Sequence, residues 1–526
     1  MLETDSMSIS VDFSPGLLTN IFIDPIDKIE FITSNHLMSK LVEYDEFNKT
    51  YRTEKVSVCS DVDPVMGKIA ITSGLVKWFL LDLIKNELVK REDIHITDSR
   101  ADVDDFHLSK IDISEYEFLY NHSSDTNIQL RDYQFEGIKT LLSSYSGILS
   151  FPTSSGKGEI IVQMSRILQQ FGQVLILVPS MSSLKSTQER LEDYNIKFYQ
   201  YHKIRNLTEI DGVILSTPKI IYNDITKKGP DSILNNVKYL ITNEVHHVQA
   251  KTWFEVSKGL PAVIRSYGFS ATPDIIDSSS DISIPEMSLR ESMIRGTHGD
   301  ILMEVKSRDI EEFISVPKAI DVVYKSRTVK PKDNLVFDWS RVKHYVYDPE
   351  RIKFVADLVH IINDYTDFTT ITFVSYIETQ GDPLYNLYPS STVCWYGGGV
   401  VNNNIGLDLN KETVFGAIKN GKEISNVIVT SHAREDINLP VLNVAIMLDL
   451  TKRQAVKQCV GRVVRQGSPS FFINIADVVP KVLSIQAKKR SKYVSEEYGI
   501  TPTIVNNLGQ FTEFFKSAWK SYSKNV

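Results

Sequence analysis

Two successive stretches of short apolar strands, each alternating with helical patterns, constrain the fold of this chain most. The first stretch covers about residues 126–310 and the second about residues 311–480. Runs such as Val174-Leu-Ile-Leu-Val178 have the length and composition of strands buried on both faces. Strands that alternate with helices form parallel sheets, because each helix carries the chain back across the sheet. The sequence therefore predicts an α/β protein with two tandem parallel sheets. The predicted strands are residues 147–151, 174–178, 212–216, 239–242 and 267–270, then 319–324, 370–374, 426–430, 443–447 and 471–474.

Length and local pattern divide the chain into four predicted parts. A chain of 526 residues is too long for one hydrophobic core. Residues 1–125 combine alternating strand patterns with one amphipathic helical pattern at about residues 75–90, which predicts a small α+β domain. Residues 126–310 and 311–480 hold the two sheets, and residues 481–526 form a basic, helical tail.

Composition excludes several classes of protein. The three cysteines, Cys59, Cys394 and Cys459, lie far apart, which excludes a disulfide framework and a cysteine-rich zinc site. The N-terminal residues lack the basic-then-apolar order of a signal peptide, and no stretch approaches the ~20 apolar residues that cross a bilayer. We therefore expect a soluble, cytoplasmic protein with no membrane partner.

Charge is distributed unevenly along the chain. The net charge of −8 argues mildly against nucleic acid as a partner, but local patches matter more than the sum. Residues 91–125 carry a net charge of −7, and the acidic stretch within them, Asp98 to Glu117, resembles a solvated connector. Residues 481–526 carry a net charge of +5. The run Lys488-Lys489-Arg490 in the tail is either a solvated helix face or a contact to phosphates.

The sharpest local feature is the segment Phe151-Pro-Thr-Ser-Ser-Gly-Lys157-Gly158, between a predicted strand and a predicted helix. Backbone N–H groups in such a turn, with a helix N-terminus behind them, cradle triphosphate oxygens. A Gly-Lys pair alone is common in loops, but this strand-turn-helix setting favours a phosphate loop. Lys157 would reach the β- and γ-phosphates. The candidate nucleotide-binding residues in this loop are Thr153, Ser154, Ser155, Gly156, Lys157 and Gly158.

A second polar element ends another predicted strand, at Asn243-Glu244-Val-His246. Glu244 is a candidate to orient or deprotonate an attacking water. An Asp normally stands where this chain has Asn243, and it holds the Mg²⁺ shell. An Asn can accept a hydrogen bond but supplies no negative charge to a hard cation. Taken alone, this strand end is equally consistent with an exposed polar turn.

In their order along about 335 residues, these segments resemble the motifs of superfamily 2 helicases of the DExH type, most closely the phage UvsW helicases. No single motif is specific, but the ordered set is. The matching segments are Arg131 to Gln134, Val178 to Gln188 (motif Ia), Ser216 to Pro218 (motif Ib), Asn243 to His246 (DExH box), Gly268 to Pro273 (motif III), Phe373 to Ile377 (motif IV), Thr430 to Pro440 (motif V) and Gln458 to Arg465 (motif VI).

The resemblance implies two RecA-like lobes with ATP and Mg²⁺ bound between them. Arg131 and Gln134 would read adenine, and the catalytic set would be Asn243, Glu244, His246, Gln458, Arg462 and Arg465. Residues that contact nucleic acid or couple it to the nucleotide would be Pro179, Thr217, Ser270, Thr272 and Thr430. No residue is predicted as a metal ligand.

The resemblance also implies the substrate and the partners. Helicases of this kind unwind, anneal and branch-migrate DNA, so we expect branched or single-stranded DNA as the partner. We further expect a monomer that works with replication or recombination proteins, in the host cytoplasm if a phage encodes it. Residues 1–125 would form a DNA-engaging module.

Three departures from the family pattern keep a second reading open. Gly158 replaces a Ser or Thr whose hydroxyl ligates Mg²⁺, Asn243 replaces an Asp, and Asp436 replaces a motif V glycine. An ATP-driven motor is favoured by the intact residues Lys157, Glu244, Arg462 and Arg465. The three departures favour a helicase-shaped scaffold that binds DNA or a protein without ATP turnover. A restriction-type translocase is a third reading, disfavoured because residues 1–125 and 481–526 contain no convincing nuclease constellation.

Overall fold

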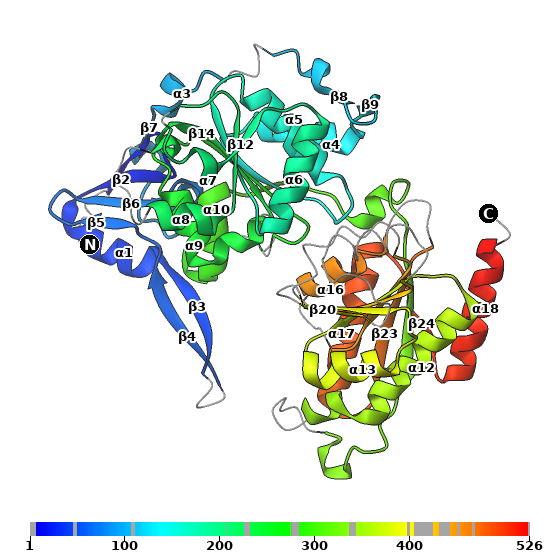
Figure 1. Cartoon of the computed structure of the whole chain (residues 1–526). Helices are drawn as coiled ribbons and strands as arrows, with labels where there is room; N and C mark the ends of the chain where they lie inside the picture. The colour runs from blue at the N-terminus through cyan, green and yellow to red at the C-terminus, as the bar shows by residue number, and fades with distance from the viewer. Residues whose placement is uncertain are drawn as a thin grey trace. The chain divides into compact units, whose positions relative to one another are not determined.

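The computed structural model of the chain divides into two compact units. One unit contains residues 1–151 and 156–304, and the other contains residues 152–155 and 305–526. Figure 1 shows the helices and strands of each unit. The structure describes residues 7–45, 50–106, 111–207, 209–225, 232–273, 275, 283–335, 343–396, 400–403, 424–430, 442–449, 453–464 and 469–523.

The first unit begins with a five-stranded sheet in the order β5-β6-β2-β1-β7. Side chains of a strand point alternately to the two faces of its sheet, and one face of this sheet is buried. In β1, Ile9 and Val11 are buried, whereas the residues between and beside them are exposed or half-buried. Helix α2 buries Val76, Phe79 and Leu83 in the same core. The elements are β1 (Ser8–Phe13), β2 (Leu18–Asp24), α1 (Ile29–His36), β5 (Asp61–Asp63), β6 (Lys68–Thr72), α2 (Val76–Lys85) and β7 (Ile94–Asp98), with a separate hairpin of β3 (Met38–Asp45) and β4 (Thr50–Ser57).

This small sheet shares its core with the α/β lobe that follows. Ile284 and Met287, from the far end of the first unit, pack into the core of the N-terminal sheet. Asp300 accepts hydrogen bonds from Lys77 Nζ at 2.7 Å and from Trp78 Nε1 at 3.0 Å. The N-terminal domain and the first lobe therefore form one continuous packed unit.

The acidic connector is partly buried, contrary to the expected solvated segment. It contains α3 (Arg100–Val103), and a hairpin of β8 (Phe118–Asn121) and β9 (Thr126–Gln129) follows it. Asp104 is 4% exposed, and its Oδ2 lies 2.7 Å from Nε of the buried Arg265 in the first lobe. Asp105 pairs with Lys238 at 2.7 Å. Buried carboxylates need such partners, so part of the acidic charge attaches the connector to the lobe.

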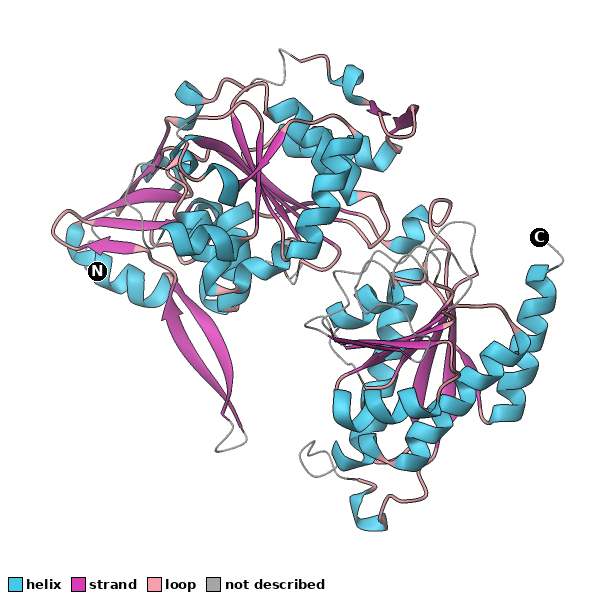
Figure 2. Ribbon diagram, viewed as in Figure 1, coloured by secondary structure: helices cyan, strands magenta, loops and turns pink. Residues whose placement is uncertain are grey.

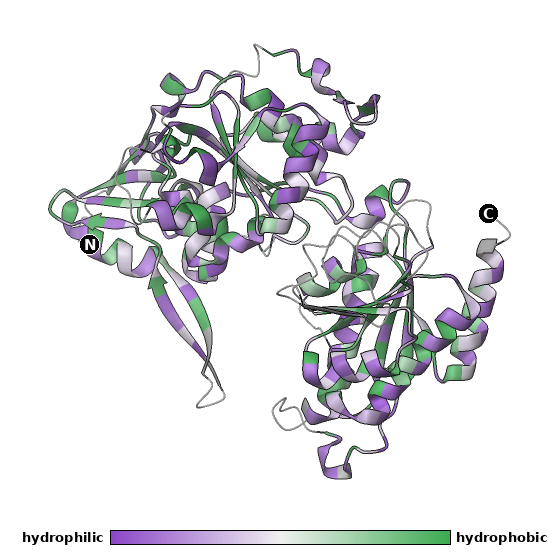
Figure 3. Ribbon diagram, viewed as in Figure 1, coloured by the Kyte–Doolittle hydropathy of each residue, from purple (hydrophilic) through white to green (hydrophobic). Residues whose placement is uncertain are grey.

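The first lobe is a seven-stranded, entirely parallel sheet in the order β12-β13-β11-β14-β15-β10-β16. Helices lie on both faces of the sheet, and they carry hydrophobic and hydrophilic residues side by side, as half-buried helices do (Figures 2 and 3). The strands are β10 (Ser146–Ser150), β11 (Gln173–Leu177), β12 (Phe198–Gln200), β13 (Val213–Ser216), β14 (Val237–Asn243), β15 (Arg265–Ser270) and β16 (Ile301–Glu304). The helices are α4 (Asp132–Leu142), α5 (Lys157–Leu168), α6 (Met181–Asp193), α7 (Tyr201–Ile204), α8 (Pro218–Ile225), α9 (Lys251–Lys258) and α10 (Leu289–His298).

The second lobe is an eight-stranded sheet in the order β20-β19-β21-β18-β22-β23-β17-β24, parallel except for the pair β19–β20. Its strands are β17 (Lys318–Tyr324), β18 (Thr370–Val374), β19 (Thr392–Tyr396), β20 (Val400–Asn403), β21 (Asn426–Thr430), β22 (Val444–Met447), β23 (Phe471–Asp477) and β24 (Thr503–Val505). Its helices are α12 (Pro349–Tyr365), α13 (Asp382–Leu387), α16 (Arg453–Val460), α17 (Lys481–Tyr498) and α18 (Leu508–Ser523). The predicted fold class, two tandem RecA-like parallel-sheet lobes with a small N-terminal domain, is confirmed.

The helical tail is confirmed as helical, and it completes the second lobe. Strand β24 pairs with β17 at the sheet edge, and Phe511 and Phe515 of α18 are fully buried in the core of the lobe. Arg490 of the basic run is 1% exposed and donates to Asn474 Oδ1 at 2.6 Å and to the Ile475 carbonyl at 2.9 Å. Lys488 and Lys489 are exposed. Of the basic run, Arg490 is therefore a core residue, neither solvated nor able to reach a phosphate.

Among the described residues, no helix has the length and the apolar character that crossing a bilayer requires.

A buried histidine in the first lobe predicts a loss of stability in acid. His298 is fully buried, its Nδ1 lies 2.7 Å from Ser266 Oγ, and burial lowers the pKa of His298 to about 3. Below pH 6.5 His298 binds a proton in the unfolded chain but stays neutral in the folded chain. The free energy of unfolding therefore falls as the pH drops from 6.5 towards 3. Between pH 7 and pH 4.5 we expect the stability of the wild type relative to His298→Gln to fall by about 2–3 kcal/mol. Urea unfolding of both proteins at a series of pH values measures this difference, and a pH-independent difference would contradict it.

Candidate functional site

The predicted motifs of the first lobe follow different strands of one parallel sheet. The phosphate loop follows β10 and motif Ia follows β11, whereas motif Ib and the DExH-like box begin at the last residues of β13 and β14. Motif III begins within β15 and ends just after it. Because all seven strands are parallel, their carboxyl ends lie at one edge, where open α/β sheets bind ligands. The sheet order therefore gathers segments that are up to about 120 residues apart in the chain.

The phosphate loop has a backbone conformation that favours glycine at its last position. Gly156 has φ +81° and is the N-cap of α5, and Ser154 also has a positive φ of 67°. A Cβ atom on Gly156 would lie 2.2 Å from Gln134 Nε2, so a side chain there would fill the turn. Lys157 is the first residue of α5, and its Nζ donates to the Phe151 carbonyl at 3.0 Å. Thr153, Ser154 and Ser155 complete the turn between β10 and α5. The loop thus fits the phosphate cradle that the sequence predicts.

The predicted adenine-reading segment is joined directly to this loop. Arg131 is the N-cap of α4, and its backbone N–H donates to Gln134 Oε1 at 2.9 Å. The other end of the same amide, Gln134 Nε2, donates to the Gly156 carbonyl at 3.3 Å. Gln134 is 4% exposed, so the two segments share a buried amide. The contact of Arg131 and Gln134 with adenine stays a prediction.

The DExH-like box and motif III form one hydrogen-bonded cluster. Strands β14 and β15 are neighbours, with Asn243 opposite Phe269. Glu244 Oε2 accepts a hydrogen bond from Ser270 Oγ at 3.3 Å and lies 3.4 Å from His246 Nδ1. His246 Nδ1 and Ser270 Oγ are 2.9 Å apart, and both residues are buried.

Backbone geometry holds this cluster at the sheet edge. Glu244 adopts a left-handed conformation, with φ 57° and ψ 59°, where the strand gives way to a short 3-10 helix. Such a conformation costs about 1–3 kcal/mol for a non-glycine residue and is found mainly at functional sites. The Phe151 N–H donates to the Ser270 carbonyl at 3.0 Å, which fixes the start of the phosphate loop beside motif III. A change at Ser270 can therefore reach both Glu244 and the loop.

The described residues do not fit a protein-ligated Mg²⁺ ion at this edge. Gly158 has no hydroxyl, and a Cβ atom there would lie 1.3 Å from Arg190 Nη1, so a cationic side chain fills the space of the usual ligand. Asn243 ends β14 as a neutral amide. No cluster of three or more His, Cys, Asp or Glu side chains in the described part of the chain could hold a metal ion. Hard cations prefer charged oxygen ligands, and the two positions that normally provide contacts for Mg²⁺ provide neither a hydroxyl nor a charge.

The remaining predicted residues of the first lobe lie at the same edge. Pro179 and Thr217 come one or two residues after the carboxyl ends of β11 and β13, and Thr217 is 6% exposed. The Thr272 N–H donates to Ser270 Oγ at 3.0 Å. Their contacts with nucleic acid stay predictions.

In the second lobe, part of the predicted set lies within the described residues. Thr430 ends β21 and is 6% exposed. Gln458 lies in α16 and is 5% exposed, and Arg462 follows that helix and is half-buried. Arg465 and residues 431–440, with Asp436, lie outside the described residues.

Sequence reasoning missed a polar cluster at the carboxyl edge of the second sheet. Asp449 follows β22, and burial raises the pKa of its carboxyl group. Its two oxygens accept hydrogen bonds from Ser375 Oγ at 2.9 Å and from Gln380 Nε2 at 3.1 Å. Ser375 and Asp449 are each the first polar residue after a buried strand, a signal that was available in the sequence. Arg190 was also missed, because only packing brings α6 beside the phosphate loop.

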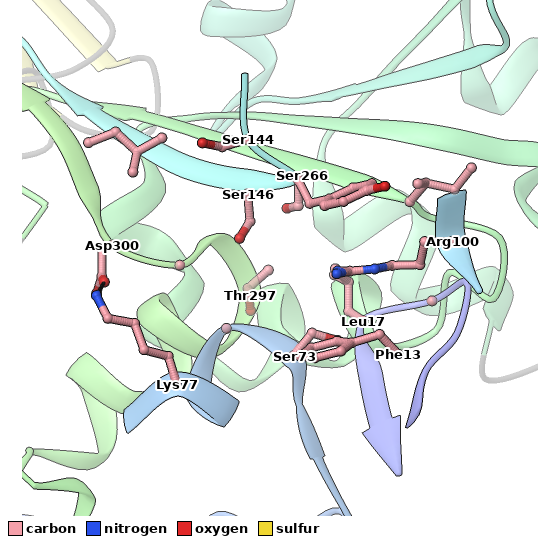
Figure 4. A pocket seen from close by; sticks show the side chains of 16 residues that line it. Phe13, Leu17, Ser73, Lys77, Arg100, Ser144, Ser146, Ser266, Thr297 and Asp300 are labelled. Carbon is pink, nitrogen blue, oxygen red and sulfur yellow. Dashed lines mark hydrogen bonds and ion pairs between the residues drawn. The ribbon is translucent and has the colours of Figure 1, made fainter. Parts of the chain in front are cut away.

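A cavity of about 400 Å³ lies between the N-terminal sheet and the first lobe (Figure 4). It is lined by Ser146 and Ser266, at the amino ends of β10 and β15, so it lies opposite the phosphate loop. Its cations are already paired: Arg100 binds Asp98 at 2.6 and 2.8 Å, and Lys77 binds Asp300 at 2.7 Å. This cavity is therefore separate from the candidate nucleotide site.

Comparisons with known proteins agree with the motif order. Residues 127–275 match the family model described as "Type III restriction enzyme, res subunit". The chain is 26% identical over 155 residues to the DNA 3'-5' translocase XPB2 of Sulfurisphaera tokodaii. The aligned residues are 30% of this chain and 33% of that protein. The chain thus spans about a third of the length of the curated relative it matches.

Solved structures are similar at low identity. The crystal structure of T4 UvsW covers 95% of this chain and 99% of that chain, with a TM-score of 0.42 and 16% identity. The ATP-dependent Type ISP restriction-modification enzyme LlaBIII bound to DNA covers 78% of this chain and 34% of that chain, with a TM-score of 0.49 and 15% identity.

The resemblance to superfamily 2 helicases is confirmed by the family match together with the motif order on two RecA-like lobes. The family match places this resemblance on residues 127–275, which hold the phosphate loop, the DExH-like box and motif III.

Proposed function

We propose that this chain is an ATP-dependent DNA helicase or translocase that unwinds, anneals or branch-migrates branched or duplex DNA. The observation that carries the proposal is the cluster of Glu244, His246 and Ser270, which joins the box at the nucleotide site to motif III. Such a connection couples a change at the nucleotide to a neighbouring strand end. Similarity over 155 residues to a protein named as a DNA translocase supports DNA as the partner.

ATP would bind with its phosphates in residues 153–157 and its adenine near Arg131 and Gln134. Lys157 would exchange its hydrogen bond with the Phe151 carbonyl for the β- and γ-phosphates. The N-terminus of the 12-residue helix α5 adds a positive dipole end behind the loop. Both effects act on the phosphates without a metal ligand from the chain.

Hydrolysis would use Glu244 as the general base. The carboxylate would take a proton from the water that attacks the γ-phosphorus, while the bond to the ADP oxygen breaks and that oxygen keeps the electron pair. Arg462 and Arg465 would stabilise charge on the transferring phosphoryl group, because a guanidinium is a permanently charged donor fork. Gln458 would assist them, and His246 would hold the Glu244–Ser270 cluster in place.

DNA would contact Pro179, Thr217, Ser270 and Thr272 at the carboxyl edge of the first sheet and Thr430 at that of the second, largely through its sugar-phosphate backbone. Short side chains and loop N–H groups can make such contacts although the chain carries a net charge of −8. We further propose that the protein acts as a monomer in the cytoplasm, alongside replication or recombination proteins.

A helicase-shaped scaffold that binds DNA or a protein without turnover is the second candidate. Gly158, Asn243 and the Arg190 guanidinium beside Gly158 favour it, since a weakened metal site slows phosphoryl transfer. The two candidates differ in one measurable property, which is ATP turnover stimulated by DNA.

ATP hydrolysis with and without branched DNA tests the proposal. We expect DNA-stimulated turnover in the native chain. Lys157→Ala should bind ATP about tenfold to a hundredfold more weakly, because a hydrogen bond to a charged group is lost. DNA binding without any turnover would establish the scaffold, and turnover that appears only in Asn243→Asp would locate the defect at the box.

A further inference from the structure

Arg190 brings a positive charge to the phosphate loop from a neighbouring helix. It lies in the last turn of α6, and α6 packs against α5, which begins at the loop. Its Nη1 atom lies 1.3 Å from the position that a Cβ atom of residue 158 would take, and its Cζ lies 2.4 Å from that position. Residue 158 is a glycine, and only a glycine leaves this space to the guanidinium.

The Arg190 side chain is oriented by an ion pair and remains partly exposed. Its Nε lies 3.5 Å from Glu159 Oε1, on the first turn of α5, and the side chain is 37% exposed. The atom next to Gly158 is Nη1, a different guanidinium nitrogen from the Nε that faces Glu159. The ion pair with Glu159 therefore orients the guanidinium and leaves donors that can reach a ligand in the loop.

We propose that Arg190 binds the phosphates of the nucleotide where other helicases of this superfamily hold Mg²⁺, so that nucleotide binding does not require a divalent cation. A side chain at position 158 normally reaches the metal that bridges the β- and γ-phosphates, so an atom in its place is close to those oxygens. A guanidinium is permanently charged and binds phosphate oxygens through two parallel hydrogen bonds.

The residues Gly158, Arg190 and Asn243 fit this role together. Gly158 makes room for the guanidinium, and Arg190 supplies positive charge in place of a cation. At position 243, a carboxylate would place a negative charge at the carboxyl edge of the sheet, where it would repel phosphates. Asn243 avoids that charge. The inference rests on the proposed nucleotide binding and leaves turnover to be decided separately.

Isothermal titration calorimetry with ATP tests the inference, with each protein measured once in MgCl₂ and once in EDTA. The proteins are the native chain, Arg190→Gln, which removes the charge, and Arg190→Lys, which keeps it. The matched control is Arg205→Gln, a half-exposed arginine of the same lobe that lies 3.9 Å from Asp224. Thermal unfolding of each variant shows whether it is folded.

We expect the native chain to bind ATP in EDTA within about threefold of its affinity in MgCl₂. Arg190→Gln should lose roughly tenfold to a hundredfold of the affinity in EDTA, as for the loss of charge-assisted hydrogen bonds. Arg190→Lys should recover part of the loss, and Arg205→Gln should match the native chain.

Three other outcomes would overturn the inference. Native binding that is lost in EDTA and returns with MgCl₂ would show an ordinary metal site and leave the proposed function intact. Unchanged affinity of a folded Arg190→Gln in EDTA would show that the guanidinium serves only its ion pair with Glu159. The absence of ATP binding in both buffers would overturn the proposed function as well.

Discussion

Replacement of Glu244 with Gln is expected to lower DNA-stimulated ATP turnover by about 10²- to 10⁴-fold, the usual contribution of a general base. The carboxylate lies within 3.4 Å of His246 Nδ1 and Ser270 Oγ, at the carboxyl edge of the sheet beside the phosphate loop. A Gln amide has the same shape and can keep one hydrogen bond to Ser270, but it cannot accept a proton at neutral pH. ATP affinity should therefore change little while turnover falls.

Steady-state hydrolysis and ATP titration on the same preparations separate these two effects. The matched control is Glu255→Gln on α9, whose side chain is 40% exposed and pairs with Lys258 at 3.7 Å. The control should keep native turnover. Native turnover in Glu244→Gln would mean that another group accepts the proton, and equal losses of affinity and turnover would mean that Glu244 acts mainly in binding.

Replacement of Arg351 with Ala is expected to destabilise the second lobe by about 3–5 kcal/mol, the usual cost of breaking a buried ion pair. Arg351 is 1% exposed, and its Nε and Nη2 bind the two oxygens of Asp477 at 2.8 and 2.9 Å. Nη2 also donates to the Leu448 carbonyl at 2.8 Å. The pair ties α12 to the ends of β22 and β23, and its loss leaves the Asp477 carboxylate buried without its cation.

Hydrogen exchange read by mass spectrometry measures this loss within the intact chain, where a single unfolding transition is not expected. Peptides from β22 and β23 should exchange about 10²- to 10³-fold faster, while peptides from the first lobe should not change. Lys492→Ala is the control, because its pair with Glu496 spans 3.6 Å with side chains 70% and 42% exposed, and such pairs contribute about 0–1 kcal/mol. Unchanged protection in Arg351→Ala would show that Asp477 finds other partners.

Local pattern in the sequence was sufficient for ten strands of the two lobes and for the order of the motifs, but it missed β12, β16, β19, β20 and β24. The predicted strand at 174–178 and the observed β11 (Gln173–Leu177) differ by one residue at each end, because a run of buried β-branched and leucine side chains is visible without any tertiary contact. The phosphate loop was visible for a similar reason, since its turn and the following helix depend on neighbours within about ten residues.

The same reasoning could not predict which charged side chains are buried or which residues they pair with. The acidic connector and the basic tail were read from composition, yet Asp104 and Arg490 are buried with specific partners. Their partners are 161 and 16 residues away in the chain, and one of them, Arg265, lies within a strand whose pattern is otherwise that of a buried core. Burial of a charge depends on a partner that packing supplies, and composition does not reveal that partner.

The sequence by itself determined that the chain forms two RecA-like lobes with superfamily 2 motifs, and that residues 158 and 243 depart from the usual metal ligands. Only the tertiary structure decided what stands in place of those ligands. Compared with the motif alone, Gly158 is the loss of a metal-binding hydroxyl. In the fold, the Arg190 guanidinium from α6 occupies the space that a side chain of residue 158 would take. The physical reason is that hydrophobic periodicity and loop patterns depend on residues close together in the chain. The position of the Arg190 guanidinium depends on the packing of α6 against α5, and local sequence does not predict that packing.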